Sequence, residues 1–400
     1  MELSSQARSR SLLALLATTF LMYGGFFMVI PLVSIHYVDD IGLAAATVGG
    51  ALAIRQVLQQ GMTLGGGILA DRWGVRNLIA AGVFIRAIGF VSLAFAETAP
   101  LLFVAMILSA LGGALFEAPS RAAVAALTTE EDRARYFAIS GIVSGVAMTA
   151  GPLLGALLLR FSFQAVSLAA AACFLIVFFI TLFVLPQVQV AAERQSFTYG
   201  IQLAIRDWPF LAFTVMLMGY WFMWVQITIS LPLVAREMAG SADAVSILYT
   251  VNAGLTALLQ YPLLRLSERY ISHMATMVVG VTIMALGLGT VALANDFSAL
   301  LLCVVVFAVG TALATPTQQT VSADLADQRA LGSYFGINAL ALAFGGGLGN
   351  FSGGRLIDLS RETGLSALPW TIFCAVGLLS VVGLCALGLV LLRRNEASYA

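Results

Sequence analysis

The stretch Gly67-Ile68-Leu69-Ala70-Asp71-Arg72-Trp73-Gly74-Val75-Arg76 decides how the rest of this chain is interpreted. It gathers charged side chains and glycines, and an apolar run of membrane-spanning length lies on each side of it. Charged side chains are costly in the hydrocarbon core of a bilayer. The stretch is therefore predicted to be a short loop at a membrane–water interface, between two transmembrane helices.

The composition predicts an all-α integral membrane protein. Of the 400 residues, 60% are hydrophobic and 10% are charged, and the mean hydropathy is +0.97. A soluble chain of this length needs more charges to cover its surface. A transmembrane β-barrel is disfavoured because its strands would alternate in short segments, whereas these apolar runs are long and unbroken.

Several classes of function find no support in the sequence. The net charge is zero and all basic residues are arginines, so we expect no nucleic-acid partner. The cysteines lie in apolar runs without metal-ligand spacing and are interpreted as packing residues. No nucleotide-binding loop or catalytic constellation is visible. We expect no cofactor, no bound metal and no enzyme activity.

Runs of roughly 20 apolar residues, the length that a spanning helix needs, predict twelve transmembrane helices. They form two groups of six, so the predicted domains are residues 1–186 and 208–400, joined by a cytoplasmic linker over 187–207. The arginines concentrate in the loops on one side, together with both termini, which indicates that both termini are cytoplasmic. The predicted helices are 11–36, 43–70, 77–96, 101–126, 136–159, 165–185, 208–235, 244–267, 273–294, 298–323, 331–357 and 369–392.

The two halves repeat each other. Ile30-Pro31-Leu32-Val33 ends the first predicted helix, and Leu231-Pro232-Leu233-Val234 ends the seventh. Gln59 and Gln260 match at the same offset. This pattern favours an ancestral six-helix unit duplicated in parallel, which is a known transporter design.

The chain, with its duplicated set of twelve helices, resembles the major facilitator superfamily, and the stretch Gly67–Arg76 resembles the loop signature of that family. In helix 5, Gly145, Gly151, Pro152 and Gly155 resemble the motif of its drug/proton antiporters. Phe116-Glu117-x-Pro119 and Arg55-Gln56-x2-Gln59 resemble its MdtH-type multidrug resistance branch. The resemblance implies a bacterial inner-membrane protein. It also implies that Gly67, Asp71, Arg72, Gly74 and Arg76 form a conformational-switch loop.

Charged residues inside predicted helices are candidates for proton coupling: Glu117, Arg121, Arg55 and Arg86. Glu117 is the carboxylate among them, and a carboxylate changes its charge whereas arginine does not deprotonate. The alternatives are that Glu117 forms a structural ion pair with Arg121 at i+4, or binds a cationic substrate. Arg55 and Arg86 either pair with Glu117 or are satisfied by neighbouring amides and carbonyls.

Aromatic and amide side chains on several predicted helices are candidates for a substrate cavity, although such residues also pack against lipid and neighbouring helices. These candidates are Tyr23, Phe26, Phe27, Gln59, Tyr220, Trp221, Trp224, Gln226 and Asn338.

The function that we expect is proton-coupled export of small, mostly apolar drugs by alternating access. Its partners would be a small-molecule substrate, protons and the lipid bilayer, and the chain would act as a monomer. The alternatives are proton-coupled symport or export of a metabolite, siderophore or lipid-like molecule, and a membrane receptor or enzyme that transports nothing.

Overall fold

The computed structural model describes residues 5–128, 130–187, 197–327 and 330–399; the side chains of residues 63–72 and of shorter stretches lie outside its described part. The described residues form helices and no strands. In this part of the chain, eleven helical segments are long and apolar enough to cross a membrane. The predicted all-α integral membrane fold is confirmed.

The chain divides into two compact units. Unit 1 comprises Met1–Leu43 and Ile54–Glu193, and unit 2 comprises Ala44–Ala53 and Arg194–Ala400. The start of the second long helix thus groups with unit 2, whereas the sequence placed all of it in the first domain.

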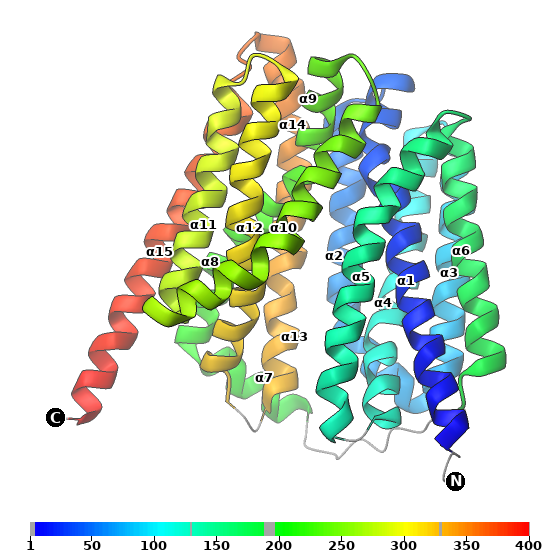
Figure 1. Cartoon of the computed structure of the whole chain (residues 1–400), viewed down its shortest axis with the longest axis vertical. Helices are drawn as coiled ribbons and strands as arrows, with labels where there is room; N and C mark the ends of the chain where they lie inside the picture. Colours follow the sequence, from blue (N-terminus) through cyan, green and yellow to red (C-terminus); the bar gives the residue numbers. More distant parts are fainter. Residues whose placement is uncertain (1–4, 129, 188–196, 328–329, 400) are drawn as a thin grey trace. The chain divides into compact units, whose positions relative to one another are not determined.

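Unit 1 is a bundle of long helices, drawn in blue to green in Figure 1. Where helices meet, α3 packs along α4 and α6, and α1 packs along α5 and α6. The helices are α1 (Ser5–Ile35, continued by the π-helical turn η1, His36–Asp40), α2 (Ala45–Trp73), α3 (Val75–Ala94), α4 (Ala99–Leu127), α5 (Glu130–Leu159) and α6 (Phe163–Val184).

Unit 2 contains more elements because two of its predicted spans are interrupted. The predicted helix 208–235 is divided into α8, η2 and α9, and the predicted helix 331–357 is divided by the π-helical turn η5. The elements are α7 (Phe197–Arg206), α8 (Trp208–Trp224), η2 (Val225–Ile227), α9 (Ser230–Ala239), α10 (Asp243–Tyr270), α11 (His273–Thr290), η3 (Val291–Leu293), α12 (Phe297–Leu325), α13 (Leu331–Ala341), η5 (Leu342–Gly346), α14 (Gly347–Thr363) and α15 (Leu368–Tyr399).

Side-chain hydrogen bonds accompany the interruption after α8. The Gln226 amide donates to the Phe222 carbonyl (2.8 Å) and to the Gly349 carbonyl (3.0 Å). The Thr228 hydroxyl lies within hydrogen-bonding distance of the Val225 carbonyl and of Asn350 Oδ1. Such bonds offer the backbone an alternative to the helical ladder, which explains how an irregular segment is tolerated inside an apolar bundle.

Glycines set the same close helix contact in both units. A Cβ at Gly112 of α4 would lie 2.5 Å from the Arg86 backbone nitrogen of α3. A Cβ at Gly310 of α12 would lie 2.5 Å from the Met284 backbone nitrogen of α11. Gly310 follows Gly112 in the sequence by the same number of positions as Met284 follows Arg86. The α3–α4 and α11–α12 pairs are therefore copies of one packing arrangement, in which small residues let two backbones approach closely.

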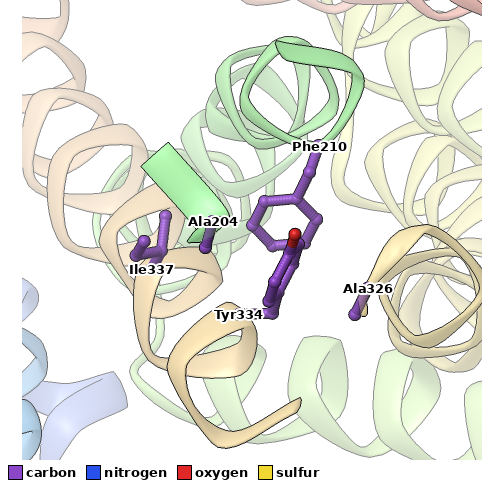
Figure 2. Packing of buried hydrophobic residues seen from close by; sticks show 5 residues of the cluster. All are labelled: Ala204, Phe210, Ala326, Tyr334 and Ile337. Carbon is purple, nitrogen blue, oxygen red and sulfur yellow. The ribbon is translucent and has the colours of Figure 1, made fainter. Parts of the chain in front are cut away.

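Helix α7 occupies the last part of the predicted linker and packs on unit 2. Its Ala204 belongs to a buried cluster with Phe210, Ala326, Tyr334 and Ile337 (Figure 2). In this cluster the rings of Phe210 and Tyr334 meet edge to face, with 4.6 Å between their centroids. The Tyr334 hydroxyl donates to Asp207 Oδ2 at 3.0 Å. The other oxygen of Asp207 caps α8 by accepting from the Phe210 N–H. Residues 188–196 of the predicted linker lie outside the described part.

The N-terminus of α2 is capped by a carboxylate from α14. The Ala45 N–H donates to Asp358 Oδ1 at 2.9 Å, and the Ala46 N–H donates to Asp358 Oδ2 at 2.8 Å. The first N–H groups of a helix have no partner within that helix, and negative charge is favourable at its positive end. A Cβ at Gly354 would collide with the Ala45 carbonyl, so small residues hold α14 close to this cap.

Removing this cap should destabilise the protein. Asp358→Ala deletes both acceptors, and we expect the free energy of unfolding in detergent micelles to fall by about 1–2 kcal/mol. Glu362→Ala on the same helix is the control, because Glu362 pairs with Arg355 at 3.5 Å on the exposed surface. An exposed pair of this kind contributes about 0–1 kcal/mol. Equal losses in the two variants would contradict the capping role of Asp358.

The glycines of α5 should differ in their tolerance of a side chain. A Cβ at Gly155 would collide with the Met28 carbonyl of α1, whereas a Cβ at Gly145 would meet no atom within 4 Å. We expect Gly155→Ala to lower the free energy of unfolding by roughly 1–3 kcal/mol. We expect Gly145→Ala to leave it unchanged or to raise it by up to about 1 kcal/mol through helix propensity. Unfolding in micelles measures both, and a larger loss for Gly145→Ala would refute this packing account.

Candidate functional site

Two buried arginines form the centre of a charged cluster in unit 1. Arg55 of α2 is 7% exposed and Arg86 of α3 is 6% exposed. Their guanidinium carbons lie 4.9 and 4.8 Å from the centroid of the same ring, that of Phe26 on α1. Arg86 also lies 5.3 Å from the ring centroid of Phe174 on α6. Cation–π attraction at these distances offsets part of the cost of burying the two charges.

Amide oxygens provide the polar contacts of Arg55. Its Nη1 donates to Gln59 Oε1 at 3.0 Å, and its Nη2 donates to Gln56 Oε1 at 2.8 Å. The Nε atoms of Arg55 and of Arg86 are buried and have no hydrogen-bond partner. A buried donor without a partner is unfavourable, and guanidinium does not deprotonate to escape that cost. The two arginines therefore retain hydrogen-bonding capacity that the protein itself does not use.

The carboxylate of the cluster is Glu117 on α4. Arg121 Nη2 donates to Glu117 Oε1 at 2.8 Å, and the side chains of Arg121 and Glu117 are 71% and 26% exposed. This is the i,i+4 ion pair that the sequence analysis gave as an alternative role of Glu117, in the favourable order with the acid first. Glu117 also interacts electrostatically with Arg86 and with the Tyr23 hydroxyl. The four residues proposed for proton coupling thus come together with Tyr23, Phe26 and Gln59.

The predicted switch loop is smaller in the structure than in the sequence analysis. Helix α2 continues through Gly67, Asp71 and Arg72 to Trp73, and α3 begins at Val75. The loop is Gly74 alone, with φ of 78°, a conformation that glycine adopts at little cost. The predicted helices 43–70 and 77–96 left a loop over 71–76, which is therefore longer than the loop in the structure. Helical backbone satisfies its own hydrogen bonds at the membrane, so the two helices extend to either side of Gly74.

The role of this stretch as a conformational switch stays a prediction. The side chains of Asp71 and Arg72 lie outside the described part, and Arg76 of α3 is partly buried.

The predicted antiporter motif of α5 is divided between two environments. Gly151 and Gly155 pack against α1, whereas Gly145 faces open space. Pro152 lies inside α5, and the helix continues through it from Glu130 to Leu159. Two of the glycines thus serve close packing of α1 and α5.

The cavity candidates of unit 2 are largely internal. Tyr220 is fully buried and its hydroxyl lies 2.8 Å from Thr315 Oγ1. Gln226 is also fully buried. Trp221 and Trp224 are partly exposed, with ring centroids 5.5 Å apart. The two tryptophans are thus partly exposed, whereas Tyr220 and Gln226 lie in the interior of unit 2.

Two further candidates are buried, one in each unit. Phe27 in unit 1 is 9% exposed and meets Phe26 edge to face at 5.2 Å. Asn338 in unit 2 donates to Ser322 Oγ at 2.7 Å, and its Oδ1 is buried without a partner.

Phe174 and Asp358 are not among the residues predicted from the sequence. Phe174 is fully buried in an apolar helix, where a phenylalanine carries no distinguishing signal. Asp358 lies in a predicted outer loop region and is separated from the α2 amides by most of the chain. The sequence signal that could have indicated Asp358 is its position as a carboxylate shortly after the glycines Gly353 and Gly354.

Comparison with known proteins identifies the family. The sequence matches the family model described as Major Facilitator Superfamily over residues 15–240 and 210–399. It is 37% identical over 380 residues to "Multidrug resistance protein MdtH" of Sodalis glossinidius, covering 95% of this chain and 94% of that protein. It is 38% identical over 384 residues to the protein of that name from Yersinia enterocolitica, covering 96% of each.

Solved structures agree on the fold. The nucleoside transporter NupG (D323A mutant) matches with a TM-score of 0.82 at 16% identity, covering 94% of this chain and 99% of that chain. A POT family transporter in complex with 5-aminolevulinic acid matches with a TM-score of 0.76 at 15% identity, covering 95% and 96%. Such low identities show the fold alone. Together with the family match and the relatives at 37–38% identity, they lead to one conclusion: this multi-pass membrane protein belongs to the Major Facilitator Superfamily.

Proposed function

We propose that this protein exports small, mostly apolar drugs in exchange for protons, by alternating access. The proposal is supported by membership of a transporter superfamily and by near full-length relatives named multidrug resistance proteins. The observation that carries the proton-coupled part is the position of Glu117, a carboxylate beside buried cations in a membrane-spanning bundle. In this proposal the protein lies in the bacterial inner membrane with both termini in the cytoplasm.

Glu117 suits proton coupling for a chemical reason. A coupled carrier needs a group that changes its charge while the site changes its exposure. Among the charged groups of the cluster, Arg55, Arg86 and Arg121 keep their charge, whereas a carboxylate gains and loses a proton. At 26% exposure, Glu117 is shielded but still reachable, so proton exchange does not require unfolding of the bundle. Protonation removes the negative charge from the pair with Arg121 and changes the charge that the bundle holds.

The proposed partners are few. The substrate and protons bind the carrier, and the lipid bilayer is its solvent. The chain acts as a monomer in this proposal, because it contains both halves of a transporter. No catalytic step is needed, so the protein is a carrier and not an enzyme.

Proton antiport can be tested in everted membrane vesicles that contain the overexpressed protein. After a pH gradient is established, we expect one or more members of a panel of cationic, zwitterionic and neutral drugs to dissipate it. Glu117→Gln should abolish the response while reaching the membrane in normal amount, because glutamine takes up no proton. Glu237→Gln is the control, since this carboxylate lies on the exposed surface of unit 2 near Arg361.

Three outcomes would count against the proposal. A Glu117→Gln variant that responds as the wild type does would assign Glu117 to the structural ion pair with Arg121. Protons that move with the substrate, not against it, would indicate symport of a metabolite or lipid-like molecule. A panel in which nothing dissipates the gradient would remove the support for drug export.

A further inference from the structure

The charged cluster of unit 1 has an excess of positive charge that the described residues do not balance. The cluster contains the positive charges of Arg55, Arg86 and Arg121 and the negative charge of Glu117. Glu117 is already paired with Arg121 at 2.8 Å. Arg55 interacts electrostatically with Arg86, a like charge, and its hydrogen-bond partners Gln56 and Gln59 are neutral. Charged side chains inside a membrane are rare, and they are expected to serve a function.

The fold itself does not need a cation at the Arg86 position. The glycine contact between α3 and α4 places Gly112 against the Arg86 backbone, and the copied contact in unit 2 places Gly310 against the Met284 backbone. Met284 is fully buried and uncharged. A neutral, flexible side chain thus satisfies this packing position in one copy of the duplicated unit. The guanidinium of Arg86 has to be explained by something other than the packing of these helices.

The geometry around Phe26 suits a ligand that is both apolar and anionic. Both guanidinium groups lie within 5 Å of the centroid of this ring, and the Nε of each is buried without a partner. Phe26 is only partly buried, and neighbouring Tyr23 is 38% exposed. The cluster thus has an exposed side, formed by Tyr23 and Arg121, while Arg55 and Arg86 are more than nine-tenths buried.

We propose that Arg55 and Arg86 bind the carboxylate of the transported substrate, with the apolar body of the substrate against Phe26. This inference rests on the proposed function and narrows its substrate class to amphipathic organic carboxylates, including zwitterions. Guanidinium offers planar paired donors that match a carboxylate, and such charge-assisted bonds are strong. In a buried site of low effective dielectric constant, the attraction between opposite charges exceeds that in water.

A matched pair of ligands tests the carboxylate directly. The purified full chain is placed in nanodiscs of phosphatidylcholine, and equilibrium dialysis measures its binding of 2-naphthoate and of 2-naphthamide, which differ in the anionic group. We expect 2-naphthoate to bind at least tenfold more tightly than the amide. Arg86→Met, which copies the residue of unit 2, should reduce 2-naphthoate binding roughly tenfold or more and leave 2-naphthamide nearly unchanged.

Two further variants separate charge from packing. Arg55→Gln should weaken 2-naphthoate binding in the same selective way, and Arg86→Lys should restore part of it, because lysine keeps the charge but not the planar fork. Arg355→Gln is the control, since Arg355 is exposed in unit 2. If Arg86→Met does not fold, Arg55→Gln and Arg86→Lys decide the question. Equal binding of the two ligands by the wild type, no binding of 2-naphthoate, or an equal loss of both ligands in folded variants would overturn the proposal.

An anionic lipid headgroup offers the same chemistry, so a second arm replaces part of the lipid by phosphatidylglycerol. Unchanged 2-naphthoate binding supports a substrate site, whereas competition that disappears in Arg86→Met would assign the site to lipid and overturn the proposal. The binding assay involves no pH gradient. Selective 2-naphthoate binding without proton movement in the vesicles would therefore support this inference and contradict the antiport proposal. Proton movement without selective 2-naphthoate binding would support antiport and overturn this inference.

Discussion

The cost of holding charge in an apolar bundle is the constraint on which this structure depends. At its irregular turns unit 2 uses neutral groups: Gln226 donates to the Gly349 carbonyl, and Asn350 accepts from the Thr228 hydroxyl. Unit 1 keeps two guanidinium groups instead: both lie against the Phe26 ring, and Arg55 also donates to the amide oxygens of Gln56 and Gln59. These contacts reduce the cost of burial without neutralising the charge. The two units therefore share an architecture but differ in the chemistry of their interiors.

Duplication explains how the units came to differ without losing the fold. The contact between α3 and α4 depends on glycines, as does the contact between α11 and α12, and in both the closest approaches include backbone atoms. Gly82 and Gly280 occupy matching places in these contacts, as do Gly89 and Gly287. Because small residues carry the helix packing, the positions of Arg86 and Met284 were free to diverge. The guanidinium of Arg86 on α3 and the thioether of Met284 on α11 are therefore compatible with the same helix packing.

The sequence predicted the features that depend on local composition. Long apolar runs indicated the helices, and the i,i+4 spacing indicated the pair of Glu117 and Arg121. It did not predict the interruption after Trp224, where Gln226 bonds to Gly349, a residue distant in the chain. It also did not predict the continuation of α2 to Trp73. Nor did it bring Arg55, Arg86 and Phe26 together, since the register between three helices is set by packing. For the same reason Tyr220 and Gln226, which looked suited to a cavity, are internal.

Helix α2 links the two chemistries along one continuous backbone. Its first turn is fixed by the Asp358 carboxylate within unit 2, and Ala53 is the last of its residues that group with that unit. Arg55 is the second residue of the part that groups with unit 1. Helix α2 contains no proline, so it lacks the commonest cause of a sharp kink. Arg55 of the charged cluster and the amides capped by Asp358 thus belong to one helix, α2. The same helix therefore has to satisfy two different demands, a carboxylate at its first turn and a buried guanidinium about three turns later, and its sequence meets the first with small residues and the second with the amides of Gln56 and Gln59.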